Sequence, residues 1–162
     1  MTQYVTALFD DLERASRTID DLISAGIHRD EISMITNEGR ASHFGVKSGS
    51  KAPEGAVTGG MIGGAIGAIG AGLVTAATAG VGILATGPIL VGLAGLGTGA
   101  VVGGLAGALV GLEIPEHEAK FYENEIRERD AILIGVATER HDHDKVAQIL
   151  ARHGPVRMRE QA

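Results

Sequence analysis

The sequence ERHDHDK at residues 139–145 is the densest group of side chains that could bind a metal ion. Its candidate ligands are His141, Asp142, His143 and Asp144. Imidazole and carboxylate groups suit transition-metal ions, but a site needs a third or fourth ligand at matching spacing. Two histidines two positions apart do not share a helix face, and an aspartate just before a helix is usually its N-cap. We therefore expect capping carboxylates and solvated imidazoles here, with no bound metal.

A second group with acid–base chemistry consists of His117, Glu118 and Glu123. General acid–base catalysis needs a nearby nucleophile or a pocket, and these residues fall on a segment expected to be an exposed charged helix. The sequence GVGILA at residues 80–85 loosely matches a dinucleotide-binding loop. It lacks the preceding strand and the ribose-binding acid that such a loop requires. We therefore expect no enzymatic activity, no catalytic residue and no cofactor.

Glycine recurs at every fourth position of the sequence GLGTGAVVGGLAGALVG. This row comprises Gly95, Gly99, Gly103, Gly107 and Gly111, and a weaker row earlier in the chain includes Gly59, Gly63 and Gly67. Each glycine weakens a helix by about 1 kcal/mol relative to alanine, so another interaction must offset that loss. Residues four apart lie along one helix face, where a glycine row lets a second backbone approach closely. We predict that these glycines are contacts for helix packing and self-association.

Most of the 25 glycines fall within residues 55–112, a stretch without Asp, Glu, Lys, Arg or His. Gly87 and Pro88 interrupt it, which predicts a helical hairpin with arms at about residues 55–84 and 89–112. Each arm exceeds the ~20 residues that span a hydrocarbon core, but glycine, alanine and threonine are weakly lipophilic. Three interpretations stay open: a membrane-embedded hairpin, a hairpin buried against its copies in a soluble oligomer, and a hairpin folded against its own sheet domain.

We call residues 55–112 the glycine-rich insertion. The charge of the chain lies in the two flanks on either side of it, and the formal net charge is -6. Phosphate binding needs a concentrated Lys/Arg surface, so nucleic acid is not an expected partner. The sequence does not open with a basic segment followed by an apolar run, and it contains no cysteine. Both features fit the cytoplasm. We expect a cytoplasmic protein that associates with the cytoplasmic membrane through its hairpin.

The first flank has the pattern strand, helix, strand. Residues 3–9 and 31–36 are predicted strands, and the helix between them is capped by Asp10 or Asp11 and ends at Gly26. The apolar face of that helix consists of Leu12, Ala15, Ile19, Leu22 and Ile23. These residues recur with the period of an amphipathic helix.

The second flank repeats the pattern. Residues 131–138 form a continuous apolar run that is typical of a central strand, and residues 156–159 form a short last strand. Asp142 or Asp144 caps the helix between them. The apolar face of this helix consists of Val146, Ile149 and Leu150.

These two units predict an α+β fold, a ferredoxin-like split βαβ sandwich. Both helices would cover one face of a four-stranded antiparallel sheet, and the other face would be open. The predicted organisation is a head formed by residues 1–36 and 131–162, a flexible linker at 37–54, the Gly/Ala-rich helical hairpin at 55–112 and an amphipathic connecting helix at 113–130. The connecting helix has an apolar stripe of Ala119, Tyr122 and Ile126, and the pairs Glu123–Arg127 and Glu125–Arg129 have the favourable i,i+4 order.

The order of these parts resembles that of the bacterial general stress proteins of the heat-induced, glycine-zipper type. The resemblance is carried by GALVGLEIPEHEAKFYENEIRERDAILIGVAT at residues 107–138, by the helix ending in ILARHG and by the glycine-rich insertion before them. It covers nearly the whole chain, and Glu113 and His117 are local variants within its most specific segment. The resemblance implies a role in the stress response and proximity to a membrane. It implies no catalytic residue.

Our preferred hypothesis is therefore a non-enzymatic stress protein whose partner is itself. The glycine rows would join copies of the hairpin in or on a lipid bilayer. A first alternative is a soluble homo-oligomeric sensor that binds a small molecule or a partner on the open sheet face. A second alternative is a pore-forming or membrane-perturbing protein.

Overall fold

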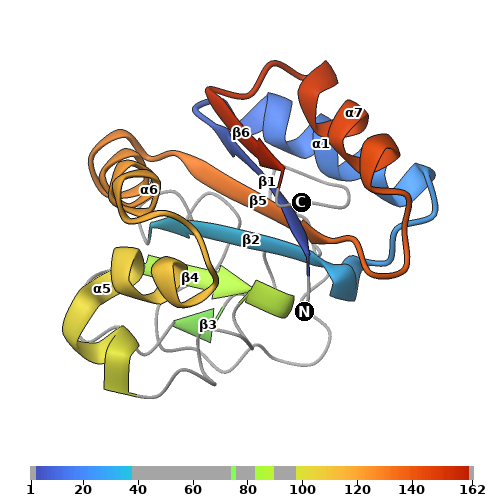
Figure 1. The fold of residues 1–162 in the computed structure, drawn as a ribbon. Helices are drawn as coiled ribbons and strands as arrows, with labels where there is room; N and C mark the ends of the chain where they lie inside the picture. The colour runs from blue at the N-terminus through green and yellow to red at the C-terminus, as the bar shows by residue number, and fades with distance from the viewer. Residues whose placement is uncertain (1–2, 38–73, 76–82, 90–97, 161–162) are drawn as a thin grey trace.

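The computed structural model describes residues 3–37, 74–75, 83–89 and 98–160, which form one sheet with helices on both faces (Figure 1). Within the described residues, the sheet has six strands in the order β3-β4-β2-β5-β1-β6. All neighbouring strands are antiparallel. Helices α1 and α7 cover one face, and helices α5 and α6 lie on the other (Figure 1). The predicted α+β class with an antiparallel sheet is therefore confirmed.

The first flank forms strand β1 (Tyr4–Phe9), helix α1 (Leu12–Ser24), a short 3-10 turn at Arg29–Glu31 and strand β2 (Ile32–Asn37). The Asp11 carboxylate caps α1 by accepting hydrogen bonds from the backbone N–H groups of Glu13 and Arg14. Within the apolar stripe, Ala15, Ile19 and Leu22 are buried. The sequence therefore predicted the position and the buried face of this helix, and Asp11 is the one of its two cap candidates that caps it.

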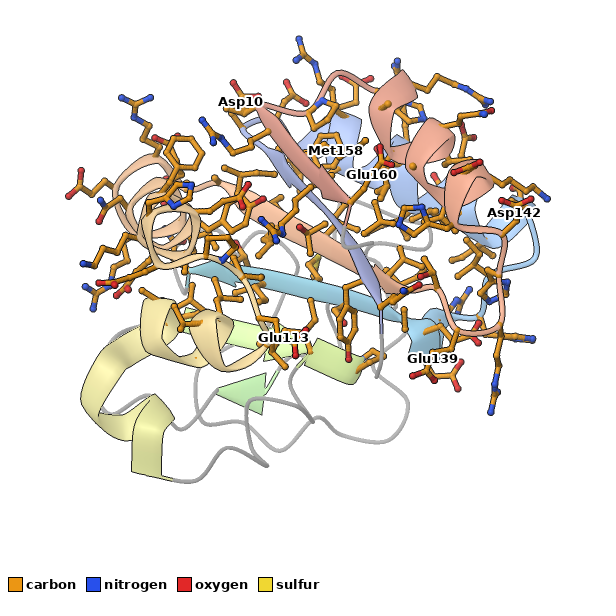
Figure 2. All side chains as sticks on the ribbon, in the orientation of Figure 1. Asp10, Glu113, Glu139, Asp142, Met158 and Glu160 are labelled. Atoms are coloured by element: carbon orange, nitrogen blue, oxygen red, sulfur yellow. The ribbon has the colours of Figure 1, made fainter. Side chains whose placement is uncertain are left out.

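The second flank forms strand β5 (Ile132–Ala137), helix α7 (His143–Arg152) and strand β6 (Arg157–Glu160). Figure 2 shows Asp142 at the start of α7, where its carboxylate accepts from the N–H groups of Asp144 and Lys145. Strand β5 is central, because it pairs with β1 on one side and with β2 on the other. The core under α1 and α7 contains side chains from every second residue of β1 and β5, among them Val5, Ala7, Ile132 and Ile134.

The insertion adds two strands to this sheet, where the sequence predicts helix. Strand β3 (Val74–Thr75) pairs with β4 (Ile83–Thr86), and β4 pairs with the outer edge of β2. The prediction of a helical arm through Leu84 is wrong at these residues. The unpaired N–H and C=O groups along the edge of β2 explain the difference, because an antiparallel neighbour satisfies them and a helix does not. Asn37 likewise closes β2 and does not begin the predicted linker.

Two glycines let the insertion lie against the sheet. Gly87 has a φ of 82°, and a Cβ at this position would lie 2.7 Å from the Ser33 Cα and closer still to the Ile32 carbonyl oxygen. The next turn places Ile89 over Gly135 of β5, where a Cβ would collide with the Ile89 side chain. The Ile89 N–H donates to the Ser33 Oγ at 3.0 Å. A glycine inside a strand often marks such a close approach, and Gly135 does so here.

Helices α5 (Thr98–Gly111) and α6 (Glu116–Arg129) complete the second layer. They share a buried cluster with the sheet, which includes Leu8, Ile35, Leu109, Tyr122 and Leu133. The sheet face that we expected to be open is therefore covered. The described part of the insertion folds against its own sheet, as one of the three interpretations predicts. Among the described helices, none combines the length and apolar character needed to cross a membrane.

Candidate self-association surface

The structure describes only part of the predicted glycine rows. Gly59, Gly63, Gly67 and Gly95 lie outside the described residues, as do residues 38–54 of the predicted linker. The others, Gly99, Gly103, Gly107 and Gly111, all lie in α5. The predicted helical conformation is therefore confirmed for this part of the main row.

A break at Gly104 divides that row. Gly104 has a φ of 62° and a ψ of -157°, a backbone conformation that is essentially restricted to glycine. The chain turns there, so Gly99 and Gly103 belong to one helical piece, and Gly107 and Gly111 belong to the next. The spacing of the four glycines predicts that they follow one straight helix face. The break places them on two helical pieces instead. The Gly103–Gly104 doublet is the sequence signal for this break.

Glu123 of α6 stabilises the second helical piece of α5. Its Oε2 accepts a hydrogen bond from the Ala106 N–H at 2.9 Å, and its Oε1 lies 3.3 Å from the Arg127 guanidinium. The first N–H groups of a helix have no partner within the helix, and they carry the positive end of its dipole. A carboxylate from a neighbouring helix accepts a hydrogen bond from such an N–H group and places a negative charge at the positive end of the dipole. The predicted Glu123–Arg127 pair is confirmed, whereas the contact with α5 was missed because it joins residues from different helices.

The second piece of α5 presents two different faces. Leu105, Ala106, Ala108 and Leu109 are buried against α6 and the sheet. The opposite face consists of Gly107, Val110 and Gly111, which we call the outer strip. Gly107 is half-buried and Gly111 is exposed, and the Val110 side chain is 41% exposed. The buried apolar contact of this piece therefore comes from the larger residues between the glycines.

The outer strip has the chemistry of a packing surface. Its three residues carry no charge and no side-chain polar atom. Val110 and Val156 are the large apolar side chains that are exposed in the described part of the chain. Spacings of three and four residues place all three residues of the strip side by side on the helix. A second backbone could approach Gly107 and Gly111 closely and bury Val110 in the same contact.

The metal-ligand candidates of residues 141–144 face different neighbours, and the His143 Nε2 has no hydrogen-bond partner among the described residues. The His141 Nε2 lies 2.8 Å from the Glu31 Oε2, and this hydrogen bond is the largest cause that lowers the pKa of Glu31 below 4.5. The His143 Nδ1 lies 3.8 Å from Asp144 and 4.0 Å from Glu160, which Figure 2 shows on β6. In the part of the chain that the structure describes, no three His, Asp or Glu side chains are arranged to hold a metal ion.

The acid–base candidates on α6 are also separated. His117 is exposed, whereas Glu118 is buried and its Oε2 accepts from the Arg159 guanidinium at 2.6 Å. Glu123 lies against α5 instead, so the three residues do not form one site. The sequence did not indicate the Glu118–Arg159 pair, because it joins α6 to a strand that follows 41 residues later.

Comparison of the chain with protein-family models, with curated proteins and with solved structures finds no match.

Proposed function

We propose that this chain is a non-enzymatic protein of the bacterial stress response that self-associates through the outer strip, Gly107, Val110 and Gly111. The exposure of Val110 between two glycines of an uncharged helix face carries the proposal. The resemblance of residues 107–138 to general stress proteins supports the biological context. The four strands from the flanks, in the order β2-β5-β1-β6, support a ferredoxin-like head that carries this surface.

The physical basis of the proposed association is backbone proximity. A helix face without bulky side chains allows dispersion contacts and Cα–H···O contacts along the two backbones. Val110 would add burial of apolar surface, which contributes roughly 25 cal/mol per Å² removed from water. The break at Gly104 restricts the described surface to one short helical piece. The contact between two copies is therefore small. We expect weak self-association, with an associated fraction that rises with protein concentration.

Membrane association is the second part of the proposal. It is supported by the length of residues 55–112 without an ionisable side chain. A bilayer would bury apolar segments of this kind at little electrostatic cost. The proposal therefore has two partners, a second copy of the chain and a lipid bilayer, and the experiment below separates them.

The experiment compares Val110→Glu with Val156→Glu. Both positions carry an exposed valine, at 41% and 45%, so either charge can be solvated without disturbing the core. Val110 lies in the outer strip and Val156 lies outside it, before β6. Sedimentation velocity over a range of concentrations, with and without detergent, measures the association of both variants and of the wild type.

We expect Val110→Glu to be monomeric at concentrations where the wild type and Val156→Glu associate. Equal association of all three proteins would contradict the outer strip as the interface. Membrane binding is read separately, by co-flotation of each protein with lipid vesicles. Wild-type protein that stays entirely with the aqueous fraction would contradict the lipid partner and leave the test of self-association intact.

A further inference from the structure

Three buried polar atoms lie where β1, β6 and α6 meet. They are the Thr6 Oγ1, the Tyr122 hydroxyl and the Arg159 Nε, and none has a hydrogen-bond partner among the described residues. Thr6 is 2% exposed and Tyr122 is fully buried. Buried polar groups are nearly always paired with protein or with an ordered water molecule, because an unpaired group loses its hydration without compensation.

The contacts of Arg159 and Tyr122 show how these atoms are arranged. One terminal nitrogen of the Arg159 guanidinium donates a hydrogen bond to the Glu118 carboxylate, at 2.6 Å. The Arg159 Nε is buried and does not take part in this bond. Burial raises the pKa of Tyr122, and the nearby Thr6 hydroxyl acts in the opposite direction. The tyrosine and threonine hydroxyls are therefore neighbours. Together they offer hydrogen-bond donors and acceptors that an added polar molecule can use.

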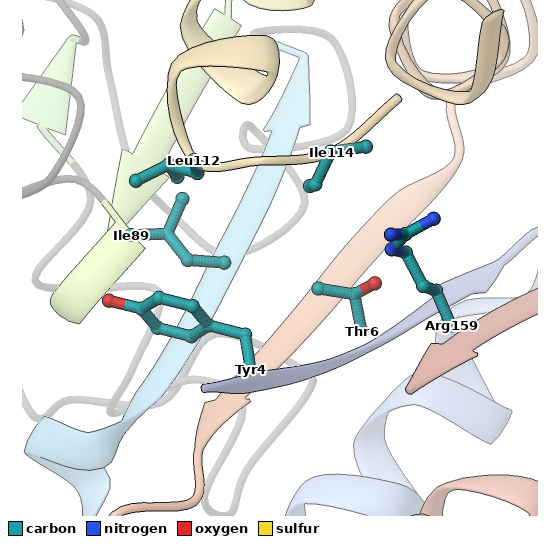
Figure 3. Close-up of a pocket in the computed structure, with 6 residues that line it drawn as sticks. All are labelled: Tyr4, Thr6, Ile89, Leu112, Ile114 and Arg159. Carbon is teal, nitrogen blue, oxygen red and sulfur yellow. The ribbon is translucent and has the colours of Figure 1, made fainter. Parts of the chain in front are cut away.

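A cavity of about 10 Å³ adjoins this cluster. It is lined by Tyr4, Thr6, Ile89, Leu112, Ile114 and Arg159. Figure 3 shows the Thr6 hydroxyl pointing toward the Arg159 side chain, with Ile114 above them and with Ile89 and Leu112 on the side of Tyr4. A volume of roughly 10–15 Å³ on this scale holds a single water molecule, provided that two or more polar partners are present.

We infer that this cavity is a binding site for one ordered water molecule, which bridges the Arg159 Nε and the Thr6 hydroxyl beside Tyr122. The water accepts from the Arg159 N–H and donates to Thr6. The hydroxyls of Thr6 and Tyr122 complete the network. The water joins the edge strand β6 to β1 beside α6, and Ile89, Leu112 and Ile114 provide apolar walls. It therefore fastens the edge strand to β1 at the point where Ile89 of the insertion packs on the sheet.

The test uses two threonines that differ in one respect. Thr6 and Thr36 are both buried in the sheet, and each has an Oγ1 without a partner in the described residues. Only Thr6 is among the residues that line the cavity. Valine has nearly the shape of threonine without the hydroxyl, so Thr6→Val removes a partner of the water, whereas Thr36→Val removes only an unpaired group.

The two substitutions should differ in their effect on the melting temperature. We expect Thr6→Val to lower Tm by about 2–4 °C and Thr36→Val to leave it unchanged or raise it. A Tm for Thr6→Val that is unchanged or raised, as for Thr36→Val, would overturn the inference, because it would show that the Thr6 hydroxyl is unpaired. If Thr6→Val does not fold, Tyr122→Phe is the second variant, with the same expected decrease and the same contradicting increase.

A crystal structure provides the direct measurement. We expect a density peak within hydrogen-bond distance of the Thr6 Oγ1 and the Arg159 Nε in the wild type. The peak should persist in Thr6→Ser, which keeps the hydroxyl, and disappear in Thr6→Val. Absence of the peak from a well-ordered wild-type crystal would overturn the inference, whatever the melting temperatures show.

Discussion

The two faces of the sheet are covered by helices that are held in place in different ways. On one face, α1 and α7 each have a regular apolar stripe and an aspartate cap from their own segment. On the other face, α5 has almost no amphipathic pattern, and its break is stabilised by Glu123 from α6. Helices of the first kind are specified by their local sequence, and α5 depends on its partners in the fold.

The hydrogen bonds of the two faces also differ in how far apart their partners lie in the sequence. The Asp11 and Asp142 caps bind backbone groups two and three residues away. The Ile89 N–H instead reaches the Ser33 hydroxyl across 56 residues of sequence. The second face is therefore built from contacts between distant segments. If this face is as firmly packed as the first, its buried side chains should contribute equally to stability.

The largest effects should come from two buried leucines, one under each pair of helices. Leu22 of α1 and Leu109 of α5 are both fully buried. We expect Leu22→Ala and Leu109→Ala each to lower the free energy of unfolding by about 2–5 kcal/mol, measured by urea denaturation. Exposed Val156→Ala is the control and should change it by no more than about 0.5 kcal/mol. A negligible effect of Leu109→Ala alone would show that the second face is not a stable core.

Gly87→Ala should have the next largest effect, because its Cβ would meet backbone atoms of Ile32 and Ser33 that cannot move aside. We expect the free energy of unfolding to fall by about 3 kcal/mol. Gly26 ends the first helix with a φ of 95° but has open space around it. Gly26→Ala should therefore cost only the conformational strain, about 1–2 kcal/mol. Equal losses in the two variants would refute the close packing of β4 and its turn on β2.

Gly104→Ala tests the break in α5. Alanine does not adopt the conformation of Gly104 without strain, and its Cβ would lie 3.1 Å from the Glu123 Oε1. We expect a loss of about 1–3 kcal/mol in the free energy of unfolding. Gly107→Ala, in the regular part of the helix, should instead raise it by up to about 1 kcal/mol. If both substitutions were stabilising, α5 would be a continuous helix in solution.

The smallest effect concerns the Glu31–His141 pair, which joins the first flank to the second. The folded-state pKa of Glu31 lies below its ordinary 4.5 because His141 stabilises the carboxylate. The pair therefore stabilises the fold above the unfolded-state pKa, and this contribution disappears as the pH falls through the folded value.

We expect Glu31→Gln to be less stable than the wild type at neutral pH by up to about 1 kcal/mol, with the difference shrinking below pH 4.5. Urea titrations at several pH values measure this. Glu116 is the control, because Lys120 also lowers its pKa but its side chain is 70% exposed. If Glu116→Gln lowered the stability as much as Glu31→Gln does, a specific role for the Glu31–His141 pair would be refuted.

The flanks could be predicted from the sequence because their signals are local. The stripe containing Ala15, Ile19 and Leu22 has helical period, and the apolar run of residues 132–137 reads directly as a central strand. Ala119, Tyr122 and Ile126 of α6 are buried as predicted for the same reason. The insertion lacks these signals, since glycine and alanine do not distinguish an inner from an outer face.

The sequence by itself determined the two strand-helix-strand units, their caps and the charged connecting helix. Only the tertiary structure decided that residues 83–86 pair with β2, that α5 breaks at Gly104 and that Glu118 binds Arg159. A helix stripe or a cap depends on residues within one or two turns, which the sequence places next to each other. Edge pairing, a carboxylate from another helix and a close approach over glycine depend on which distant segments meet, and that is settled only when the chain folds.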